Sequence, residues 1–276
     1  MQTVLALTPG AVRLGELLSQ YPQYDIYFIS SAVENSPNSR HLPVVSSPEE
    51  YEEVHLNLTK ISKNSHEEVL LIVCGGSLES AAALNVLEAF KDKRISVLYV
   101  VPDRSFLSKI ETLNERVVYH VLQEYARSGV FEKIYLVDNV SIEGILKDKL
   151  HVKNYYPLIN ETIITTFHTI NVFMHTKAIF EKASALSPAS RITTFGIGEL
   201  GSQEKDFFPL KNSQEKEYYF AITEAGIENP ETLERVKKYV QEATQGLRAN
   251  FFIHATEYEK DFVYYTTFSS QIQNIS

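Results

Sequence analysis

Apolar and polar residues alternate in blocks along the first two-thirds of the chain, and the blocks predict strands separated by helices. Short apolar runs predict strands at 3–7, 24–30, 69–73, 95–101 and 133–137. Helical spacing predicts helices over 11–20 and about 108–128, and Ser47-Pro48 predicts a further helix start, with Ser47 as the N-cap. Residues 31–47 are rich in Ser, Asn and Pro and predict a long surface loop. This order is typical of a doubly wound, mostly parallel α/β sheet.

The last third follows a different pattern. A helix without glycine is predicted over 156–176, and it is apolar on several sides, as expected of a helix buried between layers or domains. Beyond it we expect strands at 191–198 and 217–223, a charged loop at 202–216, and a helix from Asn229-Pro230-Glu231 to about 245. Strands at 250–256 and 262–269 are predicted to form a hairpin. The expected organisation is an α/β domain at 1–155, a central helix at 156–176 and a smaller α+β domain at 177–276, with a mixed or antiparallel sheet.

Composition narrows the classes of function. The chain has 276 residues, 44% apolar and 22% charged, which is ordinary for a soluble globular protein. Its net charge of −9 argues against non-specific binding to nucleic acid or anionic membranes. Cys74 is the single cysteine, so an internal disulfide is impossible and a cytoplasmic location is expected. No apolar run approaches the roughly 20 residues of a membrane span, and the histidines show no metal-ligand spacing.

The most informative segment is the strand, turn and helix start at 69–90. An apolar run breaks at Gly75-Gly76-Ser77 and leads into an alanine-rich helical pattern. Such a turn presents unpaired backbone N–H groups to a phosphate. Glu79, however, places a negative charge where a phosphate cradle needs small, uncharged residues. The turn is therefore either a nucleotide site or what remains of one. Turns at Gly10, Pro102-Asp103 and Asp138-Asn139 are expected on the same edge of the sheet.

These features together resemble the tubulin/FtsZ superfamily over almost the whole chain. Gly75-Gly76-Ser77 match the start of its GGGTGTG signature, and Leu78-Glu79-Ser80 replace the rest. Asn139 after the fifth predicted strand, Asn160-Glu161 in the central helix, and the order of the C-terminal elements also follow the family. Length and the lack of a long tail look more like the phage and plasmid tubulins. The fold class expected from the resemblance is thus tubulin/FtsZ-like α/β.

The resemblance implies a site for GTP or GDP, with Mg²⁺, at Gly10, Gly75, Gly76, Ser77, Asn139 and Asn160. In the family the two Asn residues contact guanine, because an amide offers one donor and one acceptor to its edge. The alternative for Asn139 is closure of a turn, and for Asn160 it is capping of the central helix.

Several residues depart from the family pattern. Pro9 removes an N–H donor from the first loop, and Glu79 would repel a phosphate or cap its own helix. The hydrolytic Asn-x-Asp pattern is missing, which leaves Glu181 as the only candidate acid, or as a solvated helix residue. Arg104 either pairs with a phosphate or forms a surface ion pair.

We therefore expect a tubulin/FtsZ-like cytoskeletal or scaffold protein that assembles head to tail, with nucleotide binding weakened or lost and little GTP hydrolysis. No cofactor is expected if the site is degenerate, GTP or GDP with Mg²⁺ is expected if it is functional, and no metal-binding residues are predicted. Self-association is the expected partnership, with a possible protein partner and with no nucleic acid or membrane. The alternatives are an active GTP-hydrolysing tubulin of the phage or plasmid type, and a monomeric partner-binding module. A metabolic enzyme is disfavoured, because no acid, base and nucleophile converge on the sheet edge.

Overall fold

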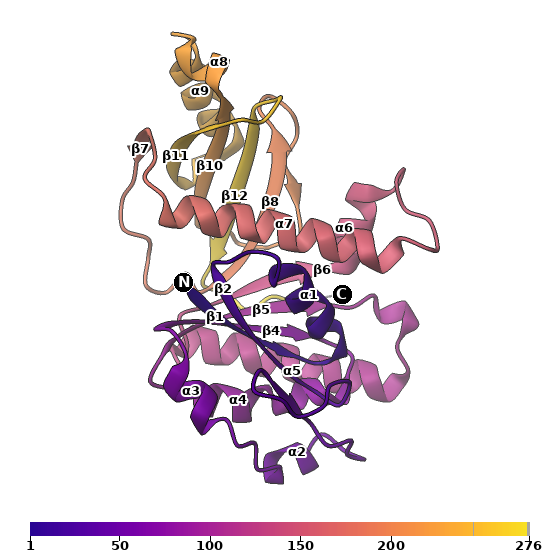
Figure 1. The fold of residues 1–276 in the computed structure, drawn as a ribbon. Coiled ribbons are helices and arrows are strands. Elements are labelled where there is room, and N and C mark those ends of the chain that lie inside the picture. The colour runs from indigo at the N-terminus through magenta and orange to yellow at the C-terminus, as the bar shows by residue number, and fades with distance from the viewer. Residues whose placement is uncertain (245, 275–276) are drawn as a thin grey trace. The chain divides into compact units, whose positions relative to one another are not determined.

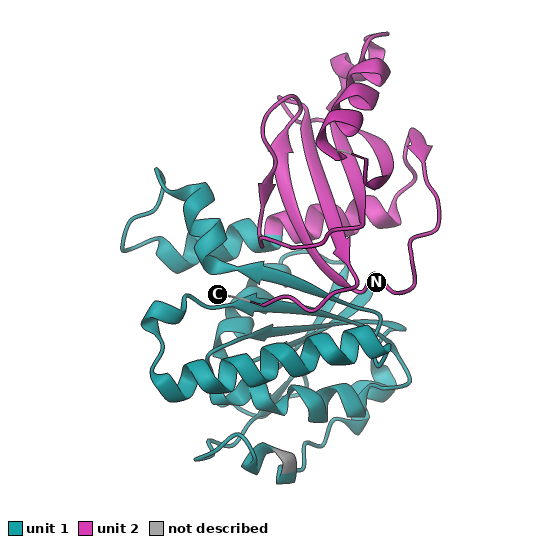
Figure 2. Cartoon of the chain, turned by 180° about the vertical axis from the view of Figure 1, so that it is seen from behind, with its two compact units in different colours: residues 1–164 teal, residues 165–276 magenta. Residues whose placement is uncertain are grey.

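The computed structural model describes residues 1–244 and 246–274 (Figure 1). The chain divides into two units, 1–164 and 165–276, and the division falls within helix α7 (Tyr155–His175) (Figure 2). This helix is the one predicted over 156–176. The strands and helices of each unit are described separately.

The sheet of the first unit has the strand order β3-β2-β1-β4-β5-β6, and its neighbouring strands run parallel. The strands are β1 (Gln2–Leu7), β2 (Tyr24–Ser30), β3 (Ser39–His41), β4 (Glu68–Cys74), β5 (Arg94–Val101) and β6 (Lys133–Asp138). The apolar runs of β1, β4, β5 and β6 are buried almost completely, as expected of parallel strands covered on both faces. The predicted doubly wound parallel sheet is thereby confirmed.

Helices cover both faces of this sheet. Helix α1 (Pro9–Leu18) lies on one face, and α3 (Thr59–Asn64), α4 (Ala83–Ala89) and α5 (Lys109–Ser128) lie on the other (Figure 1). Helix α5 begins with a capping box, in which Ser108 and Glu111 bond each other's backbone N–H groups, and it ends at Gly129 in a left-handed conformation. Short 3₁₀ turns, η1 (Leu78–Ala82) and η2 (Arg104–Phe106), follow β4 and β5, and α6 (Asn139–Leu146) follows β6.

Two predictions between β2 and β4 were wrong. The helix expected from Ser47-Pro48 starts later, as the single turn α2 (Glu50–Glu53), and Glu49 before it makes no side-chain cap. Burial of Tyr51, whose hydroxyl donates to the Pro43 carbonyl at 3.1 Å, fixes this turn instead. The loop predicted at 31–47 contains β3, which pairs with β2 although its residues, Ser-Arg-His, carry no apolar signal.

The second unit has a mixed sheet with the order β8-β12-β10-β11-β7. Its strands are β7 (Phe180–Lys182), β8 (Ile192–Glu199), β10 (Glu215–Thr223), β11 (Arg248–Thr256) and β12 (Phe262–Ser269), and the two-residue β9 (Lys205–Asp206) pairs with β8. Helices α8 (Glu224–Glu228) and α9 (Thr232–Thr244) connect β10 to β11. Aromatic and aliphatic side chains of β10, β11 and β12 form the core with Val236 of α9. The charged loop predicted at 202–216 was thus partly wrong, since it contains β9 and the first residues of β10.

The hairpin predicted for 250–256 and 262–269 was also wrong. Strands β11 and β12 do not pair, because β10 lies between them, parallel to β11 and antiparallel to β12. Tyr218, Phe220 and Ile222 of β10 are fully buried, which explains its central position. The connection crosses the end of β10, where the Thr223 N–H donates to the Asp261 carboxylate at 2.9 Å. Five residues easily span the roughly 10 Å between alternate strands.

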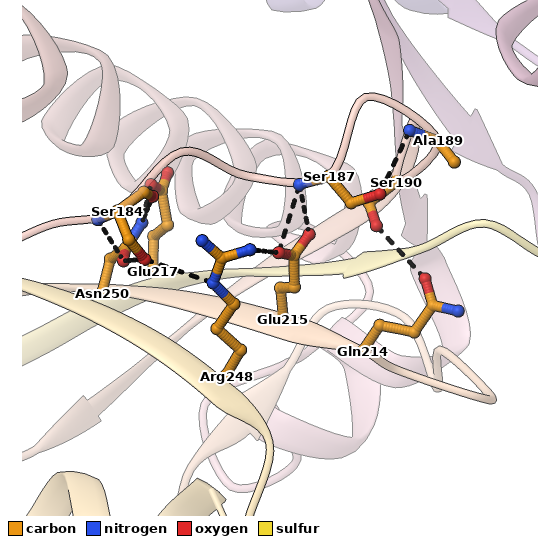
Figure 3. A network of polar contacts seen from close by, with 9 residues as sticks. All are labelled: Ser184, Ser187, Ala189, Ser190, Gln214, Glu215, Glu217, Arg248 and Asn250. Carbon is orange, nitrogen blue, oxygen red and sulfur yellow. Dashed lines mark hydrogen bonds and ion pairs between the residues drawn. The ribbon is translucent and has the colours of Figure 1, made fainter.

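The connection from β7 to β8 is held by polar contacts with β10 and β11 (Figure 3). The Ser187 N–H donates to both carboxylate oxygens of Glu215, at 2.9 and 3.2 Å, and Arg248 binds the same carboxylate at 3.1 Å. Asn250 exchanges two hydrogen bonds of 2.9 Å with the backbone of Ser184. The Ser-, Ala- and Pro-rich segment between β7 and β8 has no regular secondary structure, and side chains of β10 and β11 hold it in place.

Candidate functional site

The parallel register brings the two predicted phosphate turns together. Leu7 of β1 pairs with Val73 of β4, so the turn at Gly10 lies beside the turn at Gly75. A Cβ on Gly10 would come within 3.0 Å of the Cβ of Cys74. Cys74 in turn pairs with Val100, and Val101 pairs with Asp138, which places Asn139 on the same carboxyl edge, two strands further along. The predicted clustering of these turns on one edge is confirmed.

Thr8 joins the first turn to the end of β4. Its backbone has φ 96°, which is rare for a β-branched residue, and its side chain is fully buried. The Thr8 hydroxyl oxygen accepts from the N–H groups of Ala11, at 3.4 Å, and Cys74, at 3.3 Å. Pro9 has no N–H, so part of the first turn of α1 has no donor and part is already satisfied by Thr8. Strain of this kind costs roughly 1–3 kcal/mol and is found where the surroundings enforce it.

Packing inside the protein accounts for the two glycines of the second turn. A Cβ on Gly75 would lie 2.5 Å from the Tyr99 hydroxyl and 2.9 Å from Cγ of Glu115. Gly76 has φ 86°, a left-handed conformation that glycine adopts without strain. Both glycines are thus required by the fold, whatever the turn binds.

Glu115 also explains the position of Arg104. The Arg104 guanidinium binds one Glu115 carboxylate oxygen through Nε, at 2.8 Å, and through a terminal nitrogen, at 2.7 Å. The Glu115 side chain is fully buried and that of Arg104 is 16% exposed. The Tyr99 hydroxyl donates to the other Glu115 oxygen at 3.3 Å. The surface ion pair considered for Arg104 was wrong, because its partner Glu115 is a buried carboxylate, and pairing with a phosphate stays a prediction.

The second turn still presents backbone donors. Within the part of the chain that the structure describes, the N–H groups of Gly76, Ser77 and Leu78 donate no hydrogen bond. Ser77 is the N-cap of η1, and its hydroxyl accepts from the Glu79 N–H at 3.3 Å. Three consecutive donors at the start of a helical turn are suited to an anion.

Glu79 lies in the interior and reaches toward β2. It is 5% exposed, and one carboxylate oxygen accepts from the Ser31 N–H, at 3.2 Å, and from the Ser31 hydroxyl. Because β1 lies between β2 and β4, this contact spans the end of β1, where the Gly10 turn begins. The other carboxylate oxygen is buried and has no partner among the described residues. The capping role favoured for Glu79 was wrong, since Ser77 is the cap.

The charge of Glu79 affects its surroundings. Burial first, and then the Glu79 carboxylate, raise the pKa of Tyr51 to about 12. The carboxyl edge beside β1 and β4 therefore contains a fixed negative charge of the protein's own, close to the turns that were predicted to hold phosphates.

The structure does not give the two asparagines the alternative roles of turn closure and capping. Asp138 caps α6 by accepting from the N–H groups of Val140 and Ser141, and Asn139 is the first helical residue. Oδ1 of Asn139 is buried without a hydrogen-bond partner among the described residues. Asn160 is the sixth residue of α7 and so cannot be its cap. Neither asparagine is therefore explained by turn closure or capping.

An aromatic cavity at the start of α7 was not predicted. It has a volume of about 520 Å³ and is lined by η2, α6, α7 and the residues between the two helices, with Phe106, Tyr155 and Tyr156 among the lining side chains. The Tyr155 hydroxyl donates to Glu143 at 2.8 Å and so ties α7 to α6. Tyr156 and Asn160, four residues apart, lie on one face of α7. In the sequence, the two adjacent tyrosines at the start of this helix were the feature from which the cavity could have been predicted.

Glu181 belongs to the second unit. It lies in β7, opposite Phe252 of β11, and is exposed. It is therefore in a strand and not in a helix, as one alternative had assumed. Among the described residues no three His, Cys, Asp or Glu side chains converge as a metal site would require. None of the helices in the described ranges combines the length and hydropathy of a membrane span.

Comparison with solved structures identifies the fold. TubZ of Bacillus thuringiensis serovar israelensis, in a GTPγS-form protofilament, is 14% identical with a TM-score of 0.73, and the match covers 98% of this chain and 86% of that one. FtsZ of M. jannaschii is 14% identical with a TM-score of 0.71, covering 98% and 88%. CetZ of Methanosaeta thermophila is 12% identical with a TM-score of 0.69, covering 98% and 87%.

Comparison with protein-family models and with curated protein sequences found no match. At 12–14% identity, likeness between structures speaks for the fold alone. The predicted architecture, a parallel α/β sheet followed by a long helix and a smaller mixed sheet, is confirmed over nearly the whole chain: this protein has the tubulin/FtsZ-like fold.

Proposed function

We propose that this protein is a cytoskeletal or scaffold protein that assembles head to tail, and that it binds guanine nucleotide weakly or not at all. The observation that carries the proposal is the buried Glu79 carboxylate, fixed by Ser31 at the edge where β1 and β4 end. A carboxylate about 4 Å from a phosphate repels it by about 1 kcal/mol in water and about 4 kcal/mol at a partly shielded site.

The first turn supports the same conclusion. Pro9 offers no donor, and Thr8 already accepts the Ala11 N–H, so the start of α1 has little left to offer a phosphate. Arg104, the cation considered as a phosphate partner, already forms an ion pair with Glu115. A triphosphate with Mg²⁺ therefore fits the residues on the phosphate side poorly, and we assign no hydrolytic step to them.

Self-association is supported by the solved relatives. The TubZ structures include a protofilament and two-stranded and four-stranded filaments. A head-to-tail contact joins two different surfaces of one chain and so produces an open filament. Without a bound nucleotide to hydrolyse, such filaments would lack the switch that makes them disassemble. A scaffold is the role that fits a filament of this kind.

Sedimentation with and without nucleotide tests the proposal. Purified protein at micromolar concentration should sediment, and appear as filaments by electron microscopy, equally without nucleotide and with GTP or GDP. Guanine nucleotide should be absent from acid extracts of the purified protein. Assembly that strictly requires GTP would refute the proposal. Absence of assembly under every condition would favour the monomeric partner-binding module.

A GTP-binding protein is the second candidate, and two observations favour it. Among the residues that the structure describes, Oδ1 of Asn139 is buried without a partner, as expected of an acceptor for a base, and the N–H groups of Gly76, Ser77 and Leu78 donate no hydrogen bond. Calorimetric titration with GTP, and with guanosine alone, separates the two candidates, because a pocket that fits only the base binds both ligands about equally.

A further inference from the structure

Helix α5 carries a second apolar face that the first unit leaves uncovered. Its inner face includes Tyr119 and Leu122, which are fully buried. Ile110, Leu113 and Val117 are 72%, 63% and 55% exposed. With 3.6 residues per turn, these three side chains fall in one sector of the helix, opposite the buried ones. Exposed apolar side chains that gather in this way mark an interaction surface more often than isolated ones do.

A groove runs beside this exposed face. It has a volume of about 290 Å³ and lies between α5 on one side and η1, α4 and the start of α2 on the other. Val118 and Val121 of α5 and Leu84 of α4 line it. Asn114 also lines it, and its side-chain nitrogen is buried without a partner among the described residues. The groove thus combines apolar walls with one unused donor, which a backbone carbonyl could accept.

The rim of the groove is acidic on the side of α2. Glu49 lines the groove, and Glu50 and Glu53 are exposed beside it. None of these three carboxylates forms a salt bridge within the described ranges. The Lys and Arg residues of α5 lie on the side of that helix turned away from the groove, as the spacing of 3.6 residues per turn requires: Lys109, Arg116 and Arg127.

We propose that this groove binds an amphipathic helix of a partner protein, with apolar residues on one face and Lys or Arg on its flanks. A helix is the occupant that fits a groove between two helices, and its apolar face would cover Leu113 and Val117. Basic flanks complement Glu49, Glu50 and Glu53. A second copy of this chain fits less well, since its net charge is −9. The inference rests on this surface alone and not on the proposed function.

Fluorescence anisotropy with a labelled synthetic peptide tests the proposal on the full chain. The peptide is about five helical turns long, with leucine at i, i+3, i+4 and i+7 spacing and lysine on the other face. It should bind with a micromolar dissociation constant. Leu113→Ser together with Val117→Ser should weaken binding at least tenfold, and Glu49→Gln with Glu53→Gln should weaken it and reduce its dependence on salt.

The chain offers a matched control. Val130 is 55% exposed, as Val117 is, but does not line the groove, so Val130→Ser should leave binding unchanged. A peptide of scrambled order and one with glutamate in place of lysine should bind at least tenfold more weakly. Equal binding of these peptides, no binding of the basic peptide, or groove variants that bind like wild type would each overturn the proposal. So would a dimer, seen by sedimentation velocity without peptide, that Val117→Ser dissociates, because the occupant would then be a second copy.

Discussion

Glu79 places a buried carboxylate at the edge where the predicted phosphate turns lie. The turn that precedes it contains Gly75, Gly76 and three N–H groups that donate no hydrogen bond within the described part of the chain, a geometry suited to an anion. The Glu79 carboxylate accepts from Ser31 through one oxygen, and the other oxygen has no partner among the residues that the structure describes. The result is an edge with donors for an anion next to an anion that belongs to the protein.

Replacement of Glu79 by Gln should therefore increase affinity for GTP. The amide keeps the size of the side chain and can still accept from the Ser31 N–H, but it removes the charge. Loss of a repulsion of about 1–4 kcal/mol corresponds to an affinity gain of about fivefold or more. Isothermal titration with GTP measures the gain. Glu88→Gln, at an exposed position on α4, is the control and should change nothing. If Glu79→Gln folds normally and its affinity for GTP stays the same, the carboxylate is not what weakens the site.

At the scale of elements, the β5–α5 connection depends on one buried ion pair. Arg104 of η2 and Glu115 of α5 are brought together across eleven residues, and Gly75 and Tyr99 pack against the same carboxylate. A buried charge that loses its partner is costly, whereas an exposed pair contributes little. The position of η2, and with it Phe106 at the aromatic cavity, should therefore depend on this pair.

Arg104→Ala should destabilise the protein by about 3–5 kcal/mol, because it leaves the Glu115 carboxylate buried and unpaired. Urea denaturation followed by circular dichroism measures the change. The exposed pair of Arg13 and Glu16 is the control, and Arg13→Ala should cost at most about 1 kcal/mol. The double variant Arg104→Met with Glu115→Leu should recover most of the loss, since neither charge then remains. Equal effects at Arg104 and Arg13 would contradict the assigned role of the buried pair.

Elements with a strong local pattern were predictable from the sequence, and their partners often were not. The strands at 95–101 and 133–137 and the helix ending at Gly129 were confirmed within a residue or two, because apolar runs and caps are local signals. Strand β3 was missed because it is polar and exists only through pairing with β2. The pairing of β11 and β12 was predicted wrongly, since the insertion of β10 between them depends on burial of Tyr218 and Phe220, which no local pattern reports.

The same limit applies to the candidate site. Parallel strands made it predictable that the turns at Gly10, Gly75 and Asn139 share one edge. The contact of Glu79 with Ser31 joins residues 48 apart, and the left-handed backbone of Thr8 has no signal in its residue type. We expect phosphate binding at this edge to depend on these two features. The sequence could indicate that the charge of Glu79 conflicts with a phosphate, but it could not indicate the contact with Ser31 or the backbone conformation of Thr8.

At the scale of the whole molecule, the balance between folded and unfolded chains should depend on pH through buried histidines. Burial lowers the pKa of both His254 and His168 below the ordinary value of about 6.5. His254 stacks on Phe173 with ring centroids 4.4 Å apart, and its Nε2 is buried without a partner among the described residues. The folded protein thus holds these rings neutral at a pH where the unfolded chain has already bound protons.

The sign of the pH dependence follows from that difference. Below about pH 6.5 the unfolded chain binds protons that the folded chain does not, so the free energy of unfolding should fall as the pH falls toward the lowered pKa values. Each such histidine contributes at most about 1.4 kcal/mol per pH unit. Urea denaturation between pH 5.5 and 7.5 measures the slope, and His254→Phe, which keeps the stacked ring, should make it shallower. A slope that His254→Phe does not alter would mean that His254 is as easily protonated in the folded protein as in the unfolded chain.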